Sequence, residues 1–164
     1  MAQNTPPYHV PVYIAPVNLS GQVAEVSSPS SGSDLHTGYP NPPGETTQQW
    51  NIDPFDISSN QYFIKLNSKS NLVIQSSEDE YIPAFLAVQG DRYANQGIQL
   101  WVFEQQPEPD TWRFKNYKTN RYLYLNYDGR GQPGQPGVPI VTSSDPVAGY
   151  NGHNADWRIS EVQK

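Results

Sequence analysis

The sequence predicts an all-β fold built from three similar repeats. Sixteen Pro and twelve Gly residues are spread along the 164-residue chain, and they interrupt every window long enough for a helix. Short runs such as Tyr62–Leu66 and Arg121–Leu125 combine aromatic and aliphatic side chains, which favours strands. A similar pattern also returns after roughly 50 residues, a period typical of repeat architectures.

The clearest repeated feature is a tryptophan that closes each unit. Trp50, Trp101 and Trp157 are each followed two residues later by a large apolar residue. Because side chains two residues apart in a strand lie on the same face, each Trp shares a face with that apolar residue. A Gln stands two residues before the first two tryptophans, and Ala155 takes this place in the third unit. We therefore expect the three Trp side chains to be buried in equivalent places.

The elements follow one another in the same order in each unit: an aromatic strand, a polar turn and a second strand. The starts of units one and three align without gaps, Ser20–Gln22 with Thr119–Arg121 and Ala24–Val26 with Leu123–Leu125. The turns use residues that tolerate a positive φ or bond their own backbone. Unit two begins at Tyr62 and continues through Leu72–Gln75, with one residue of register left open. We expect about twelve short strands in three similar units.

Three such units, two closing on Gln-x-Trp and one on a degraded copy, resemble the ricin-B-type β-trefoil lectins, in particular the intracellular lectins of fungi. The resemblance covers residues 8–163. It implies a six-stranded barrel capped by three hairpins, with the motif Trp of each unit in a shared core. Because the chain length suits one domain, we expect a single domain over residues 1–164, with repeats at approximately 8–56, 57–107 and 108–164.

Composition excludes several classes of function. Ten Lys and Arg against sixteen Asp and Glu give a net charge of −6, the wrong sign for a protein that collects nucleic-acid phosphates. The chain has no Cys, which excludes disulfides and thiolate metal sites and favours a reducing compartment. Its N-terminus has no apolar leader, and no run approaches the ~20 apolar residues of a membrane span. We expect a cytoplasmic protein that binds no nucleic acid and does not insert into membranes.

Catalytic and metal-binding patterns are also missing from the sequence. His9, His36 and His153 stand far apart, with no metal-ligand spacing around them. The acidic run Glu78–Glu80 follows a predicted strand and is interpreted as a solvated loop. The Gly-rich run Gly129–Gly137 holds two Pro residues, which lack the backbone donors that a phosphate cradle needs. We expect no enzymatic activity, no cofactor and no metal.

Sugar binding needs an acidic group for paired hydroxyls, an aromatic ring for the apolar C–H face and an amide that fixes orientation. In unit one the resemblance implies Glu25 as the acid, Tyr39 as the ring with His36 nearby, and Thr47 beside Gln48. Glu25 is one methylene longer than the Asp usual in the family, and Thr47 replaces the usual Asn. Such sites are shallow and wet, so each binds weakly.

Unit two departs further from the family pattern. It has Gln75 or Ile74 at the acid position and Ile98 at the Asn position, and no aromatic residue falls cleanly at the stacking position. We therefore predict that the family's sugar site is lost in this repeat.

Unit three offers a second candidate site by a different route. It keeps Asn154 but has Tyr124 at the acid position, with Asn126 and Asp128 just beyond it. A polar, aromatic-rich loop of this kind would bind a glycan by rules of its own. The alternative is that Tyr124 only packs against Tyr122 and other strand neighbours.

Two main hypotheses of function result. The first is a non-catalytic lectin for galactose, N-acetylgalactosamine or related glycans, in which homodimerisation would add avidity. By family analogy its role would be defence against grazing animals. The second is a β-trefoil protease inhibitor acting through the segments Ser28–Gly44 and Gly129–Pro139. A purely structural interaction domain is a third interpretation.

Overall fold

The computed structural model describes residues 5–41, 46–90, 96–129 and 137–162. Twelve strands lie in these ranges, four in each repeat. Repeat one contains β1 (Pro11–Pro16), β2 (Val23–Val26), β3 (Leu35–Gly38) and β4 (Trp50–Asp56). Repeat two contains β5 (Gln61–Leu66), β6 (Lys69–Gln75), β7 (Phe85–Val88) and β8 (Trp101–Gln105). Repeat three contains β9 (Thr111–Asn116), β10 (Tyr122–Leu125), β11 (Ile140–Ser143) and β12 (Trp157–Glu161).

Helical structure in the described residues is limited to single turns. The α-helical turn α1 covers Gln96–Gln99, and the 3-10 turns η1, η2 and η3 cover Val17–Leu19, Ile57–Ser59 and Tyr150–Gly152. None of the helices found in the described ranges is long and apolar enough to cross a membrane.

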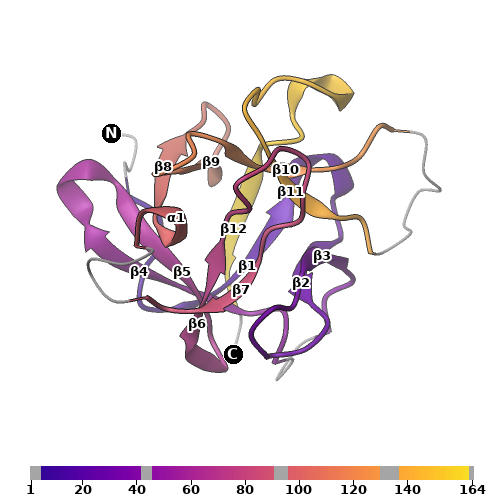
Figure 1. Cartoon of the computed structure of the whole chain (residues 1–164). Coiled ribbons are helices and arrows are strands. Elements are labelled where there is room, and N and C mark those ends of the chain that lie inside the picture. Colours follow the sequence, from indigo (N-terminus) through magenta and orange to yellow (C-terminus); the bar gives the residue numbers. More distant parts are fainter. Residues whose placement is uncertain (1–4, 42–45, 91–95, 130–136, 163–164) are drawn as a thin grey trace.

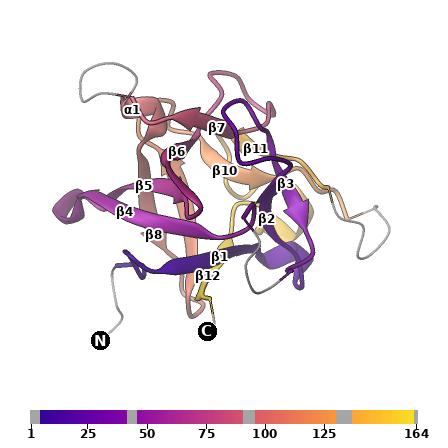
Figure 2. The same ribbon diagram turned by 90° about the horizontal axis from the view of Figure 1, so that it is seen from below.

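Six strands close into an antiparallel barrel. β1 pairs with β12 and β4, β5 pairs with β4 and β8, and β9 pairs with β8 and β12, so the ring has no open edge. The other six strands form the hairpins β2–β3, β6–β7 and β10–β11. Figures 1 and 2 show these strands in two views at right angles, the second from below, with β2 and β3 side by side. The prediction of an all-β trefoil is confirmed.

The three motif tryptophans occupy equivalent places in the core, as expected from their spacing. Each has 0% of its surface exposed. The indole Nε1 atoms of Trp50, Trp101 and Trp157 donate to the carbonyls of Ala24, Ile74 and Leu123 at 3.1, 3.0 and 3.0 Å. Each repeat therefore ties its last strand to its second strand by the same buried hydrogen bond.

These bonds determine which residues correspond between repeats. The residues that follow the three accepting carbonyls are Glu25, Gln75 and Tyr124, so Gln75 and not Ile74 stands at the acid position of repeat two. The amides of Val26, Ser76 and Leu125 donate in turn to the carbonyls of Thr47, Ile98 and Asn154. The gap-free alignment of the starts of repeats one and three is thereby confirmed.

The hairpins are linked around the threefold axis by loops from neighbouring repeats. β3 forms a bridge between His36 and Pro139 of repeat three, and Thr37 N donates to Val138 O at 3.0 Å. The corresponding bridges join Phe85 to Asp34 and Val141 to Pro83. Any site beside a hairpin is consequently bordered by two repeats.

Candidate functional site

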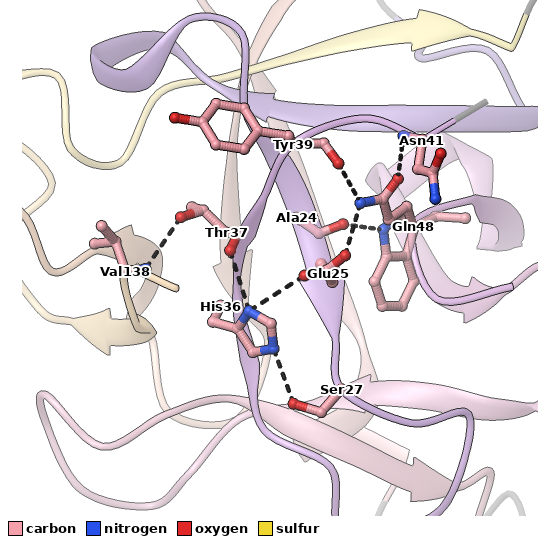
Figure 3. A network of polar contacts seen from close by, with 10 residues as sticks. Ala24, Glu25, Ser27, His36, Thr37, Tyr39, Asn41, Gln48 and Val138 are labelled. Carbon is pink, nitrogen blue, oxygen red and sulfur yellow. Dashed lines mark hydrogen bonds and ion pairs between the residues drawn. The ribbon is translucent and has the colours of Figure 1, made fainter. Parts of the chain in front are cut away.

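A polar cluster lies on the β2–β3 hairpin, and buried Gln48 is at its centre (Figure 3). Gln48 Nε2 donates to Glu25 Oε2 and to the Tyr39 carbonyl, both at 2.6 Å. Gln48 Oε1 accepts from Asn41 N at 2.9 Å. The amide of Gln48, which is 2% exposed, therefore holds the carboxylate of Glu25 and the backbone of the loop that follows β3 in one arrangement.

His36 approaches the same carboxylate from the neighbouring strand. Glu25 and His36 are directly paired across the hairpin, and His36 Nδ1 lies 3.6 Å from Glu25 Oε1. A hydrogen bond of 3.1 Å joins His36 Nε2 to Ser27 Oγ. Both side chains are partly exposed, so the carboxylate and the imidazole are accessible from solvent.

Gly38 makes room for the Glu25 carboxylate. A Cβ atom at this position would lie 2.6 Å from Glu25 Cδ and 2.8 Å from Glu25 Oε2, closer than real Cβ contacts allow. Repeat two has Ala87 at the same place, opposite Val73, and a neutral Gln75 at the position of Glu25. Repeat one is therefore distinguished by an acid, Glu25, and a Gly that leaves space for its carboxylate. The spacing of Glu25 and Tyr39 in the sequence does not reveal this role of Gly38.

We expect Gly38→Ala to displace the Glu25 carboxylate, because the added Cβ would lie 2.6 Å from Glu25 Cδ. A crystal structure of the variant measures this displacement, and its thermal midpoint verifies folding. Ala87→Gly is the matched control in repeat two and should leave the Glu25 carboxylate in place. A Glu25 carboxylate that keeps its position in Gly38→Ala would contradict the role of Gly38.

The structure brings together most of the predicted groups of repeat one, but in unequal roles. Tyr39 contributes its carbonyl to the Gln48 network, while its ring is 51% exposed and extends away from the Gln48 amide (Figure 3). Thr47 accepts a backbone hydrogen bond from Val26 at 3.1 Å through its carbonyl. The cluster therefore presents the Glu25 carboxylate, with the exposed Tyr39 ring on the adjoining loop.

Repeat two contains the same scaffold with different chemistry. Gln99 Nε2 donates to Gln75 Oε1 and to the Val88 carbonyl, both at 3.0 Å, and Gln99 Oε1 accepts from Gly90 N at 2.8 Å. The motif Gln is therefore a structural residue in both repeats. What repeat one adds is the negative charge of Glu25 and the aromatic ring of Tyr39, which stands where repeat two has Val88.

Repeat three places its predicted residues in two layers. Tyr124 and Asn154 are only 4% and 1% exposed. Asn154 Nδ2 donates to Tyr127 O and Tyr124 Oη at 2.7 and 3.3 Å, and Asn154 Oδ1 accepts from Asn18 at 2.7 Å. Asn126 and Asp128 are exposed. A surface ligand can reach Asn126 and Asp128, whereas Tyr124 and Asn154 pack and bond beneath the surface.

The environment of Tyr124 agrees with the alternative in which this side chain only packs against its neighbours. Its ring lies in a buried cluster with Val141 and Ala155, against which Tyr122 packs. Ala155 stands where the other repeats have Gln48 and Gln99. Among the residues that the structure describes, no group of three His, Asp or Glu side chains is placed to hold a metal ion.

Comparison with known proteins identifies the fold. No protein-family model and no curated protein matches the sequence. Among solved structures, a mosquitocidal holotoxin matches with a TM-score of 0.72 and 21% identity, over 99% of this chain and 18% of its own. The designed threefold-symmetric protein ThreeFoil matches with a TM-score of 0.69 and 14% identity, over 93% of this chain and 99% of its own.

A third match is the lectin of Polyporus squamosus bound to the influenza-binding epitope Neu5Acα2-6Galβ1-4GlcNAc. Its TM-score is 0.67 at 16% identity, over 94% of this chain and 50% of the lectin. The chain thus spans a small part of the holotoxin and half of the Polyporus lectin. Together with the closed barrel and three hairpins, these likenesses establish that the chain adopts the β-trefoil fold.

Proposed function

We propose that this protein is a non-catalytic lectin that binds glycans of the galactose, N-acetylgalactosamine or a related type through the Glu25 cluster. The observation that carries this proposal is the Glu25 carboxylate, held by buried Gln48 at 2.6 Å on a partly exposed hairpin, with the ring of Tyr39 exposed nearby. The β-trefoil likeness to a lectin solved with a glycan supports the same class of ligand.

Each group has a separate task in this proposal. Glu25 accepts hydrogen bonds from adjacent sugar hydroxyls, and His36 beside it offers a second polar group. Tyr39 covers the apolar C–H face of the sugar. Gln48 uses Nε2 for Glu25 and the Tyr39 carbonyl, so it positions the site and leaves ligand contact to the others.

A single shallow site of this size binds weakly. Binding to a multivalent glycoprotein gains avidity when more than one site engages or when two copies of the chain associate. The proposed ligands are therefore glycans and glycoproteins, and the proposed activity is recognition without chemical change.

We expect Tyr39→Ala to weaken glycan binding about 10-fold, because the variant no longer covers the apolar C–H face of the sugar. Tyr39→Phe should bind nearly as the wild type, since it keeps the face and loses only the hydroxyl. Isothermal titration with the best ligand from a glycan array measures both variants. Equal losses in both would assign the effect to the hydroxyl and contradict stacking.

A protease panel run beside the glycan array separates lectin from inhibitor. The two segments predicted as inhibitory loops, 28–44 and 129–139, lie partly outside the described residues. Glycan binding without protease inhibition supports the proposal. If the protein inhibits a protease and binds no glycan on the array, the protease-inhibitor hypothesis replaces the lectin proposal.

A further inference from the structure

We propose that Asn151 is a site of spontaneous deamidation, at which the side-chain amide is converted to a carboxylate. Asn is a thermolabile residue type, and Asn151 is the only Asn in the sequence that is followed by Gly. It lies in the single turn η3, and its side chain is exposed to solvent. Because Gly152 has no Cβ, no side chain hinders attack by its backbone nitrogen on the neighbouring amide carbon. This proposal does not depend on the proposed lectin function.

The reaction exchanges one amide for another within the chain. Gly152 N attacks Asn151 Cγ, so a new N–Cγ bond forms and the Cγ–Nδ2 bond breaks. The proton lost by Gly152 N leaves on the departing ammonia, and a cyclic imide remains. Water then adds to one of the two imide carbonyls. Cleavage of the N–Cγ bond gives Asp, whereas cleavage of the original peptide bond gives isoaspartate, in which the main chain runs through Cγ.

The backbone around Asn151 offers little resistance to this attack. Asn151 has a φ of 57° and a ψ of 7°, a left-handed conformation inside a 3-10 turn that has no side-chain cap at Gly149. Gly152 N donates to Gly149 O at 3.4 Å, beyond the usual range of about 2.7–3.2 Å. Rotation about the Asn151 ψ bond, which brings Gly152 N toward Cγ, therefore costs one long hydrogen bond at this nitrogen.

Asn120 provides a matched comparison within the same chain. It is exposed, as Asn151 is, and its φ of 58° is nearly the same. The residue after it is Arg121, which has a Cβ beside the attacking nitrogen, and Arg121 N donates to Thr119 Oγ1 at 3.2 Å. The two sites therefore share exposure and local conformation, and they differ in the residue that supplies the attacking nitrogen.

Deamidation at Asn151 acts on contacts that join η3 to its neighbours. Asn18 Nδ2 donates to the Tyr150 carbonyl at 2.9 Å and to Asn154 Oδ1 at 2.7 Å. The Tyr150 ring packs edge-on against Tyr127, with 5.4 Å between the ring centroids. Isoaspartate adds one methylene to the main chain directly after Tyr150, so it displaces the Tyr150 carbonyl or ring from these contacts. The Asp product keeps the length of the main chain and adds one negative charge to the net charge of −6.

The test incubates the folded full-length chain in neutral buffer and follows the Asn151 and Asn120 peptides by mass spectrometry. An isoaspartate-specific carboxyl methyltransferase with labelled S-adenosylmethionine detects the isoaspartate product. We expect deamidation at least about tenfold faster at Asn151 than at Asn120, a difference of about 1.4 kcal/mol in activation free energy. Asn151→Gln should abolish the methyl label, because attack on the longer side chain forms a larger ring more slowly. A rate at Asn151 no higher than that at Asn120, or a methyl label retained in Asn151→Gln, would overturn the proposal.

A second measurement tests whether the folded turn permits the reaction. The rate at Asn151 is compared between the folded chain and the chain unfolded in guanidinium chloride. Because η3 opens at the cost of one long hydrogen bond, the two rates should agree within about tenfold. Buried Asn154, which is followed by Ala155, is the control that folding should protect. Protection of Asn151 as strong as that of Asn154 would show that the turn blocks the attack and would refute the site.

Discussion

Trp101→Ala is expected to lower the free energy of unfolding by ~3–5 kcal/mol, because it opens a cavity in a core that has no exposed surface at this position. The substitution also removes the 3.0 Å hydrogen bond to the Ile74 carbonyl and leaves that group buried without its partner. A domain of this size is stable by only about 5–15 kcal/mol, so the loss threatens folding itself. Chemical denaturation of the wild type and the variant measures the difference.

Two further variants make this experiment decisive. Trp101→Phe keeps a ring but loses the indole donor, so its stability should lie between wild type and Trp101→Ala. Phe55→Ala removes an aromatic side chain that is 40% exposed and should cost much less. A Trp101→Ala protein that unfolds at the wild-type midpoint would contradict the core role of the motif tryptophan.

Glu25→Ala is expected to weaken glycan binding by ~10-fold or more, because charge-assisted hydrogen bonds are worth about 1.5–3 kcal/mol. The substitution removes the carboxylate that would accept the sugar hydroxyls, and it also removes an acceptor of the Gln48 amide. Calorimetric titration with the best glycan from the array measures the affinity, and a thermal melt verifies that the variant is folded.

Glu25→Gln separates charge from structure. Repeat two shows that a Gln at this position accepts the bond from the motif Gln, at 3.0 Å between Gln99 Nε2 and Gln75 Oε1. We therefore expect Glu25→Gln to retain wild-type stability while it loses affinity. If Glu25→Ala and Glu25→Gln both bind glycan as tightly as the wild type, the ligand does not use this carboxylate.

Local patterns in the sequence were sufficient to predict the architecture. The Trp at the end of each unit, the apolar residue two positions later and the polar turns all report on short-range strand geometry, which depends on neighbours in the chain. The turn positions Gly21 and Asn120, aligned from sequence, do share a positive φ, of 92° and 58°. The sequence left the register of repeat two open by one residue, and only the hydrogen bond from Trp101 to the Ile74 carbonyl resolves it.

The candidate site of repeat one was only partly predictable. Glu25, Tyr39 and Gln48 were named from their order in the motif, and the structure joins them in one network. The space provided by Gly38 leaves no trace in the motif, because it concerns the approach of a side chain across the hairpin. Burial of Tyr124 likewise depends on Val141 of β11 and on Ala155 in the turn before β12.

The sequence alone therefore determined the strand-rich character of the chain, its three repeats and the burial of Trp50, Trp101 and Trp157. Only the tertiary structure decided which polar side chains face solvent and which repeats share a pocket. The physical reason is that exposure and cavity shape arise where distant segments come together, as where Lys118 of repeat three and Phe85 of repeat two line the same cavity. Strand periodicity does not indicate which distant segments become neighbours, because closure of the barrel and the loops between neighbouring repeats determine this.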